Sequence, residues 1–139
     1  MGVLAELYVA NDDQQALQYD ASPDVFADRR PYRSFTALEL STLWSIMQGA
    51  EWDVALMDEF PALLVVNGGE RLIHRLPKPM MEALAKMTLE EIQTSSEAWA
   101  STEELRCKPS DVQPIIEGLI QLSRKASATG KAVYLWICV

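Results

Sequence analysis

His74 is the residue of this sequence that best suits acid–base chemistry, because it is the only histidine and an imidazole titrates close to neutral pH. Asp53, Asp58 and Glu59 precede the segment that carries His74, and they are the candidates for its catalytic partner. The alternative for His74 is a half-buried strand position, hydrogen-bonded to a neighbour. The alternative for the three carboxylates is a solvated loop. A small enzyme of unknown reaction is therefore the second hypothesis for this chain.

The motifs of the best-known catalytic and nucleotide-binding sites are missing from the sequence. No serine lies in a Gly-x-Ser-x-Gly elbow, and Gly68-Gly69 is too short for a Walker or dinucleotide-binding loop. Cys107 and Cys138 are the only cysteines and lack metal-ligand spacing, so we expect two reduced thiols. The cations on either side of Cys107 should lower the pKa of its thiol. We expect no metal site, no cofactor and no catalytic triad.

Two tryptophans with acidic neighbours are candidates for a binding surface. Trp52 lies between Glu51 and Asp53, and Trp99 falls on a helical position next to that of Glu103. An acidic helix with one large aromatic side chain suits docking to another protein. The alternative for Trp99 is a core anchor for an otherwise polar helix. The two remaining tryptophans lie on patterns that predict burial: Trp44 and Trp136.

The composition indicates one acidic domain. The 139 residues are 49% hydrophobic, which is enough for a single core, and no Pro/Gly/Ser-rich stretch divides the chain. Twenty Asp and Glu against twelve Lys and Arg give a formal charge of −8. That charge repels phosphate backbones and anionic membrane surfaces. We therefore expect a single domain over residues 1–139 that binds neither nucleic acid nor membrane.

The ends of the sequence bear on its location. The longest wholly apolar run, Ala132–Val139, is far shorter than the ~20 residues that a membrane helix needs. The first residues lack the basic segment of a secretory signal. We therefore expect a bacterial protein of the cytoplasm.

Hydrophobic periodicity in the first part of the chain predicts a strand, a helix, a connection and a second helix. Residues 3–10 are apolar and β-favouring, and a capped helix should follow to about Tyr19. Residues 23–35 show no period, which predicts a long irregular connection. A capping box then precedes the apolar stripe of a core helix over residues 37–48.

The middle of the chain predicts a hairpin. Asn67-Gly68-Gly69 tolerates the positive φ of a tight turn, and it separates two apolar segments at 62–66 and 71–76. Side chains alternate between the two faces of a strand. His74 should therefore share one face with the leucines at positions 72 and 76.

The last part of the chain predicts three helices and a strand. The helices should cover residues 80–87, 89–105 and 111–128. The 89–105 helix carries serines where a core helix carries aliphatic residues, so we expect much of its surface to be exposed to solvent. The closing run at 132–139 is apolar on both faces, which is typical of a strand covered on both sides. We therefore place this strand in the middle of the sheet, beside the first strand and beneath the helices at 37–48 and 111–128.

The fold class follows from the order of these elements. Strands and helices do not alternate regularly and the hairpin requires antiparallel pairing, which favours an α+β fold with a small mixed or antiparallel sheet and about four to five helices. The opening strand with its capped helix, the Leu43-Trp44-x-x-Met47-x-Gly49 helix end, and the closing helix that runs into Gly130 and an apolar strand resemble the uncharacterised bacterial YfbM-like family. This resemblance implies a small cytoplasmic fold. It implies no activity and no site residue.

The first hypothesis for the function is a binding or accessory protein without catalytic activity. An acidic chain that lacks catalytic motifs suits a protein that neutralises or adapts a basic partner, as acidic immunity-type proteins do. A homodimer is a third hypothesis. It would form through the exposed parts of the Met80–Met87 helix or through a hairpin edge.

Overall fold

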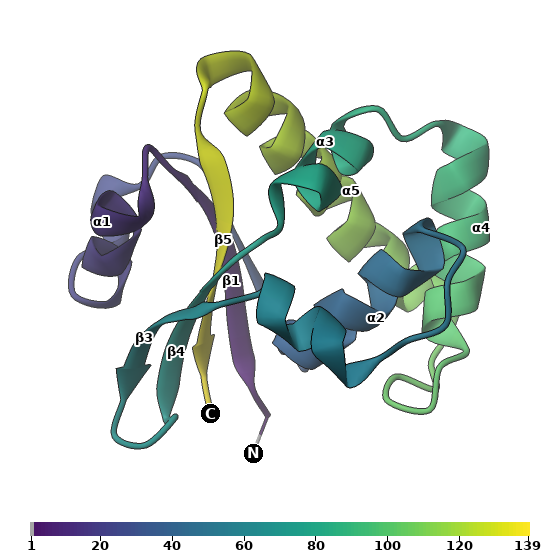
Figure 1. The fold of residues 1–139 in the computed structure, drawn as a ribbon, viewed down its shortest axis with the longest axis horizontal. Helices are drawn as coiled ribbons and strands as arrows, with labels where there is room; N and C mark the ends of the chain where they lie inside the picture. The colour runs from purple at the N-terminus through teal and green to yellow at the C-terminus, as the bar shows by residue number, and fades with distance from the viewer. Residues whose placement is uncertain (1) are drawn as a thin grey trace.

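The computed structural model describes residues 2–139 and contains a five-stranded antiparallel sheet with the strand order β2-β1-β5-β4-β3 (Figure 1). The strands are β1 (Leu4–Ala10), β2 (Arg29–Arg33), β3 (Ala62–Val66), β4 (Arg71–Arg75) and β5 (Ala132–Cys138). The α-helices are α1 (Asp13–Ala16), α2 (Ala37–Met47), α3 (Lys78–Ala85), α4 (Leu89–Ala100) and α5 (Pro109–Thr129). Short 3-10 segments are η1 (Leu17–Asp20), η2 (Pro23–Val25) and η3 (Val54–Glu59). The predicted α+β class is confirmed.

β5 occupies the centre of the sheet. It pairs with β1 in one continuous register from Leu4↔Cys138 to Ala10↔Ala132, and β4 pairs along its other edge. The predicted place of this strand, central and beside β1, is confirmed. Both edges of β5 are saturated with backbone hydrogen bonds, so the C-terminal strand joins the two halves of the sheet.

The two faces of β5 lie in two different cores. Val133, Leu135 and Ile137 belong to the main core, on the side of helices α2–α5. Tyr134 and Trp136 lie on the other face, in a smaller core with residues of α1, η1 and η2. Trp136 is only partly buried there, although its pattern predicted burial. The reason is the length of the cover, because α1 and the two 3-10 segments are each only three or four residues long.

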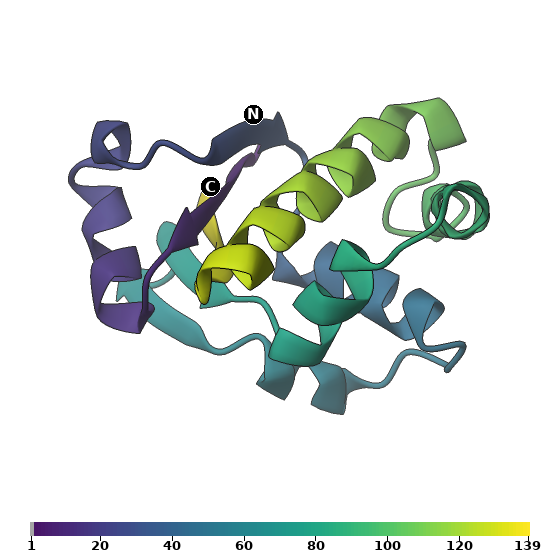
Figure 2. The same cartoon turned by 90° about the horizontal axis from the view of Figure 1, so that it is seen from above.

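Helices α2, α3, α4 and α5 form a layer on one face of the sheet (Figure 2). α5 contacts α3 and α4 on one side and β1 and β5 on the other. Capping boxes begin α2 and α4, and Gly130, whose φ is 67°, ends α5 in the left-handed conformation that glycine tolerates. None of the helices formed by residues 2–139 combines the length and hydropathy needed to cross a bilayer.

The prediction of a long irregular connection over residues 23–35 is wrong in part. Residues 29–33 form the edge strand β2, which pairs with β1. This strand has no apolar alternation, so hydrophobic periodicity could not find it. Its Pro31 lacks a backbone N–H, which an edge strand tolerates. Tyr32 and Arg30 attach β2 to α5, since the Tyr32 hydroxyl donates to the carbonyl of Pro114 and the guanidinium of Arg30 donates to Gln121.

The expected exposure of the 89–105 helix is confirmed, since six residues of α4 between Leu89 and Glu97 are exposed, but the helix is shorter than predicted. α4 ends at Ala100, and its Ser95, Ser96 and Trp99 are buried. Serine can occupy a buried helical face when its hydroxyl finds a backbone acceptor, and Ser96 Oγ donates to the carbonyl of Ile92 at 2.7 Å. Small buried side chains let a helix lie close to its neighbours, so α4 packs on α5 with few aliphatic residues.

The helix expected between residues 3–10 and Tyr19 is divided. Asp12 is its N-cap, and the Asp12 carboxylate accepts from the backbone N–H of Gln15 at 2.8 Å. The α-helical part ends at Ala16 and continues as the 3-10 segment η1. The hairpin, by contrast, is confirmed, with positive φ at all three residues of the 67–69 turn.

Deletion of the last six residues, 134–139, should abolish folding. The deletion removes Tyr134, Leu135 and Ile137, which are buried, and separates β1 from β4. Each large buried side chain contributes about 1.5–3 kcal/mol, and the whole domain has only about 5–15 kcal/mol of stability. Circular dichroism with a thermal melt would test this. A truncated chain that melts cooperatively near the full-length temperature would contradict the assigned role of β5.

Gly118→Ala should destabilise the protein, although alanine ordinarily stabilises a helix interior. A Cβ atom at this position of α5 would lie 1.9 Å from the Tyr32 hydroxyl oxygen. Overpacking of this kind costs about 1–3 kcal/mol, whereas the gain in helix propensity is about 1 kcal/mol. Tyr32→Phe in the same chain removes the closest atom and should restore most of the loss. Urea denaturation of the two single variants and the double variant measures the change in the free energy of unfolding. A Gly118→Ala chain as stable as the parent would show that Tyr32 of β2 does not pack tightly against α5.

Candidate functional site

His74 lies inside the main core and not in a cleft. Its side chain faces the helices, on the predicted face of β4, and the residue is 8% exposed. Its Nδ1 lies 2.9 Å from the carbonyl oxygen of Phe60. A carbonyl oxygen only accepts, so Nδ1 carries the proton. Burial lowers the pKa of His74, and the hydrogen bond to Phe60 opposes that shift. The neutral imidazole is therefore already satisfied by the backbone.

The three carboxylates proposed as partners of His74 have other positions. Asp53 caps η3 by accepting from the backbone N–H of Ala55 at 2.8 Å. Glu59 accepts from the indole of Trp44 at 3.3 Å, and Asp58 is exposed. Within residues 2–139, none of the three forms a hydrogen bond with His74. Glu59 lines a cleft of about 1060 Å³, whereas His74, Asp53 and Asp58 do not.

Trp52 and Trp99, the two aromatic candidates, differ in exposure. Trp99 is fully buried, and its indole N–H donates to the backbone carbonyl of Glu39 at 2.9 Å, so it fastens α4 to α2. Its side chain is therefore a core anchor and is not available to a partner. Trp52 is 40% exposed, and its N–H donates to Ser41 Oγ at 2.9 Å. Glu103 lies exposed in the turn after α4.

The remaining polar candidates offer no reactive centre. The expected lowering of the Cys107 thiol pKa is wrong in direction, because burial and then the charge of Asp111 raise it. Arg106 and Lys108 are exposed, whereas Cys107 is itself partly buried. Among residues 2–139, no group of three or more His, Cys, Asp and Glu side chains converges as metal ligands.

Charge is distributed unevenly along the chain, and the sequence analysis missed this signal by counting charge over the whole chain. Residues 34–66 and 87–105 hold ten of the 20 carboxylates and none of the 12 Lys and Arg. The rest of the sequence holds ten carboxylates and twelve cations, so it is slightly basic. The ten carboxylates belong to Glu39, Glu51, Asp53, Asp58, Glu59, Glu90, Glu91, Glu97, Glu103 and Glu104. All of them except Glu39 are exposed.

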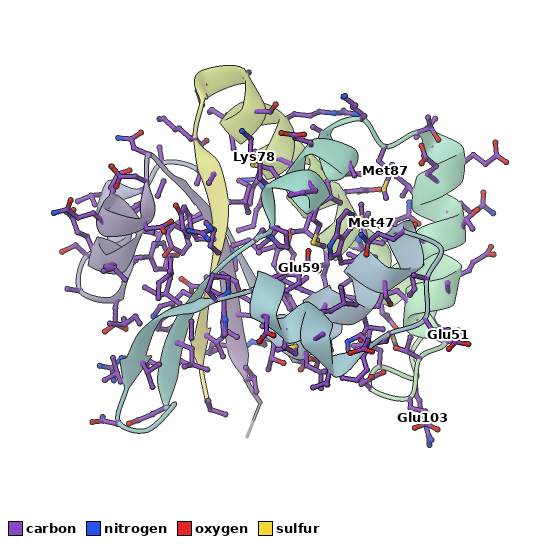
Figure 3. All side chains as sticks on the ribbon, in the orientation of Figure 1. Met47, Glu51, Glu59, Lys78, Met87 and Glu103 are labelled. Atoms are coloured by element: carbon purple, nitrogen blue, oxygen red, sulfur yellow. The ribbon has the colours of Figure 1, made fainter. Side chains whose placement is uncertain are left out.

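These two segments adjoin in space, and we call their surface the acidic face. α2 contacts both α4 and η3, and the indoles of Trp52 and Trp99 hydrogen-bond to α2 from either side. Glu51 and Glu103 mark the outer edge of this face, on the side of the molecule away from α1 (Figure 3). Its large exposed apolar side chains include Trp52 and Leu89, which is 85% exposed. The face therefore combines negative charge with apolar contact points.

A small groove lies within the acidic face, where the end of α2 meets α3 and the start of α4. Its volume is about 270 Å³. Met47 and Met87 line it together with Ile46, and Glu90 and Glu91 lie at its rim (Figure 3). Methionine side chains are flexible and polarizable, so they adapt to apolar groups of different shape. The groove can hold one apolar side chain with carboxylates beside it.

The homodimer surfaces suggested by the sequence differ in availability. The methionine stripe of α3 is not free, because Met80, Met81 and Leu84 are buried in the main core. The hairpin edge is free along β3, which pairs only with β4 and has Val65 exposed.

Comparison with known proteins gives no relative. No family model matches the sequence, no curated protein is significantly similar, and no solved structure resembles the fold significantly. The resemblance to the YfbM-like family therefore stays a prediction. The function has to be argued from this chain alone.

Protonation of His74 should destabilise the fold. The pKa of His74 is lowered in the folded state, so below the unfolded value of about 6.5 the unfolded chain binds the proton more readily. The stability that neutral His74 provides is therefore present above this pH and is lost as the pH falls towards the folded-state pKa. His74→Asn keeps an N–H for the Phe60 carbonyl and cannot titrate. Urea melts between pH 7.5 and 5 should show a steeper loss for the parent than for this variant, and parallel curves would contradict the assignment.

Proposed function

We propose that this chain is a non-enzymatic binding protein that docks on a basic surface of another protein through its acidic face. The observation that carries the proposal is the segregation of charge: ten carboxylates and no Lys or Arg in residues 34–66 and 87–105. A surface of one sign raises the rate of encounter with a partner of the opposite sign and suppresses wrong partners. Phosphate backbones are repelled by the same surface.

Charge supplies selectivity, and the apolar groups on the acidic face supply affinity. Hot spots of protein interfaces are usually aromatic or apolar anchors surrounded by polar groups. Trp52 and the Met47–Met87 groove have this arrangement, with Glu51, Glu90 and neighbouring carboxylates around them. The partner that fits is a basic protein surface that presents at least one apolar side chain between Lys or Arg residues. Neutralisation of a basic protein, as by an immunity-type protein, is one form of this function.

The alternative, an enzyme that uses His74 with a carboxylate, gains no support from the positions of its residues. A general base must reach a substrate, and His74 is enclosed in the core with its Nδ1 engaged by Phe60. The cleft of about 1060 Å³ that Glu59 lines contains no histidine. We therefore favour the binding function.

Reversal of charge on the acidic face should weaken binding of a basic probe far more than the same reversal elsewhere. The probe is an 18-residue amphipathic helix built from Leu and Lys, and its binding is measured by calorimetry at physiological salt. Glu90→Lys, Glu97→Lys and Glu103→Lys together should weaken binding by at least about tenfold, since each lost contact between charged groups is worth up to about 1 kcal/mol. The three residues are exposed, so the variant should fold.

The matched control reverses three exposed carboxylates outside the acidic face, Asp24, Glu70 and Glu117. Both variants change the net charge equally, and salt screens distant charges over about 8 Å. The control should therefore bind within about threefold of the parent. An equal loss in the two variants would mean that only total charge attracts the probe, and the docking face would be rejected. Recovery of basic proteins from the native host by the parent but not by the acidic-face variant would extend the test to a natural partner.

A further inference from the structure

A second concave site lies at the opposite end of the helix layer from the acidic groove, where β1 and β4 end and β5 begins. It is a cleft of about 1060 Å³ between the start of α1, the start of α3 and the end of α5. Small-molecule sites in proteins commonly have volumes of about 300–1,000 Å³. The cleft is thus large enough for a ligand of the size of a short peptide.

The floor of the cleft is apolar and rigid. Leu76, Met81, Ala126 and the ring of Tyr134 line it, and all four are buried members of the two cores. Leu76 directly follows β4, and the other three residues lie in α3, α5 and β5, so regular elements of the core hold the floor. A ligand with apolar groups would cover them without a rearrangement of the chain.

Charges of both signs line the walls, and one pair is already neutralised within the protein. Asp13 forms an ion pair with Arg75 and accepts a hydrogen bond from the Tyr134 hydroxyl at 2.8 Å. This arrangement fixes Asp13 and Arg75, so neither is free to hold a ligand. The cleft therefore has to be judged by its other charged residues.

The uncommitted charges include two cations and at least one carboxylate. Lys78 and Lys131 form no ion pair and no side-chain hydrogen bond within residues 2–139, and the same is true of Glu82. Glu59 and Asp12 also line the cleft, each with one oxygen engaged by a single donor of the protein. Lys78 and Glu59 both lie on the helix side of the sheet (Figure 3). Ammonium groups and carboxylates thus face one cavity without satisfying one another.

From this arrangement we infer that the cleft binds a small zwitterion with an apolar body, of the size and chemistry of a di- or tripeptide. Its carboxylate would lie near Lys78 and Lys131. Its ammonium group would lie near Glu82, Glu59 or Asp12, and its apolar side chains would cover the floor. A purely anionic or purely cationic ligand would leave one set of protein charges unmatched and would face repulsion from it. This site shares only Glu59 with the carboxylates of the acidic face, and the variants that test the two proposals share no residue, so either proposal can fail without the other.

The test compares three forms of one tripeptide, Leu-Ala-Leu: the free zwitterion, the N-acetylated anion and the C-terminal amide cation. Binding is measured by calorimetry and located by amide chemical-shift changes in the full chain. We expect the zwitterion to bind at least about tenfold more tightly than either blocked form, because each blocked form loses one charge-assisted contact. Shift changes should centre on Gly130, Lys131 and Lys78.

Variants then assign the carboxylate end. Lys78→Gln with Lys131→Gln should weaken the zwitterion and the N-acetylated form by about tenfold or more, and should not weaken the cationic amide, which the two lysines repel. The matched control is Lys86→Gln with Lys108→Gln, two exposed lysines outside the cleft, and it should change no affinity by more than about twofold. Equal binding of the three forms, shift changes elsewhere, or no binding at 10 mM of any form would overturn the inference.

Discussion

The pairing of β5 with β1 along one edge and with β4 along the other determines where every other element can lie. β1 brings β2 and the α1–η1 cover, and β4 brings the hairpin strand β3 and, through Pro77, helix α3. The apolar side chains of β5 alternate between two cores, so both faces of the sheet must be covered. One face receives four helices. The other face receives only the short segment of α1, η1 and η2, so the two faces of the sheet are covered unequally.

The short cover depends on buried hydrogen bonds and aromatic stacking as well as on apolar area. Asp20 accepts from the indole of Trp136 at 2.9 Å and pairs with Arg71 at 2.8 Å, and these contacts, with that of Trp136 the larger, lower the pKa of its carboxyl. Tyr19 stacks on Tyr8 with ring centroids 3.9 Å apart, and burial is the main reason that the pKa of both phenols is raised. Asp13 forms similar contacts at the other end of the α1–η1 segment. Asp20 and Asp13 therefore hold this segment against β4 and β5. Because Asp13 pairs with Arg75, it forms no ion pair with the lysines of the cleft.

Hydrophobic patterning was sufficient where an element buries a stripe of its own. Local sequence was enough to predict the apolar stripe of α2, the strand β5, which is apolar on both faces, and the 67–69 turn. β2 and α4 do not, because backbone pairing with β1 defines β2, and contacts of Ser95, Ser96 and Trp99 with other helices define the buried face of α4. Such contacts join residues far apart in the chain.

The candidate sites were harder to predict from the sequence than the fold was. His74 was the first chemical candidate by residue type, yet its environment is set by Phe60, 14 positions away. The cleft draws on four separate stretches of the chain, so no local motif could mark it. The acidic face, by contrast, was within reach of the sequence, since the absence of Lys and Arg from residues 34–66 and 87–105 needs no coordinates. Regional charge, counted by segment, would have located it.

The partnership of β1 with β5 also constrains the biosynthesis of this protein. A ribosome makes β1 before the other elements of this sheet, and all of the helices are synthesised before Ala132–Cys138 are added. Until then β1 has only the charged edge strand β2 beside it, and the apolar floor beneath the helices lacks its middle strand. The nascent chain therefore cannot complete its sheet segment by segment. It acquires its fold in one late step, after translation has passed β5, and before that step its apolar strands are exposed to chaperones and proteases.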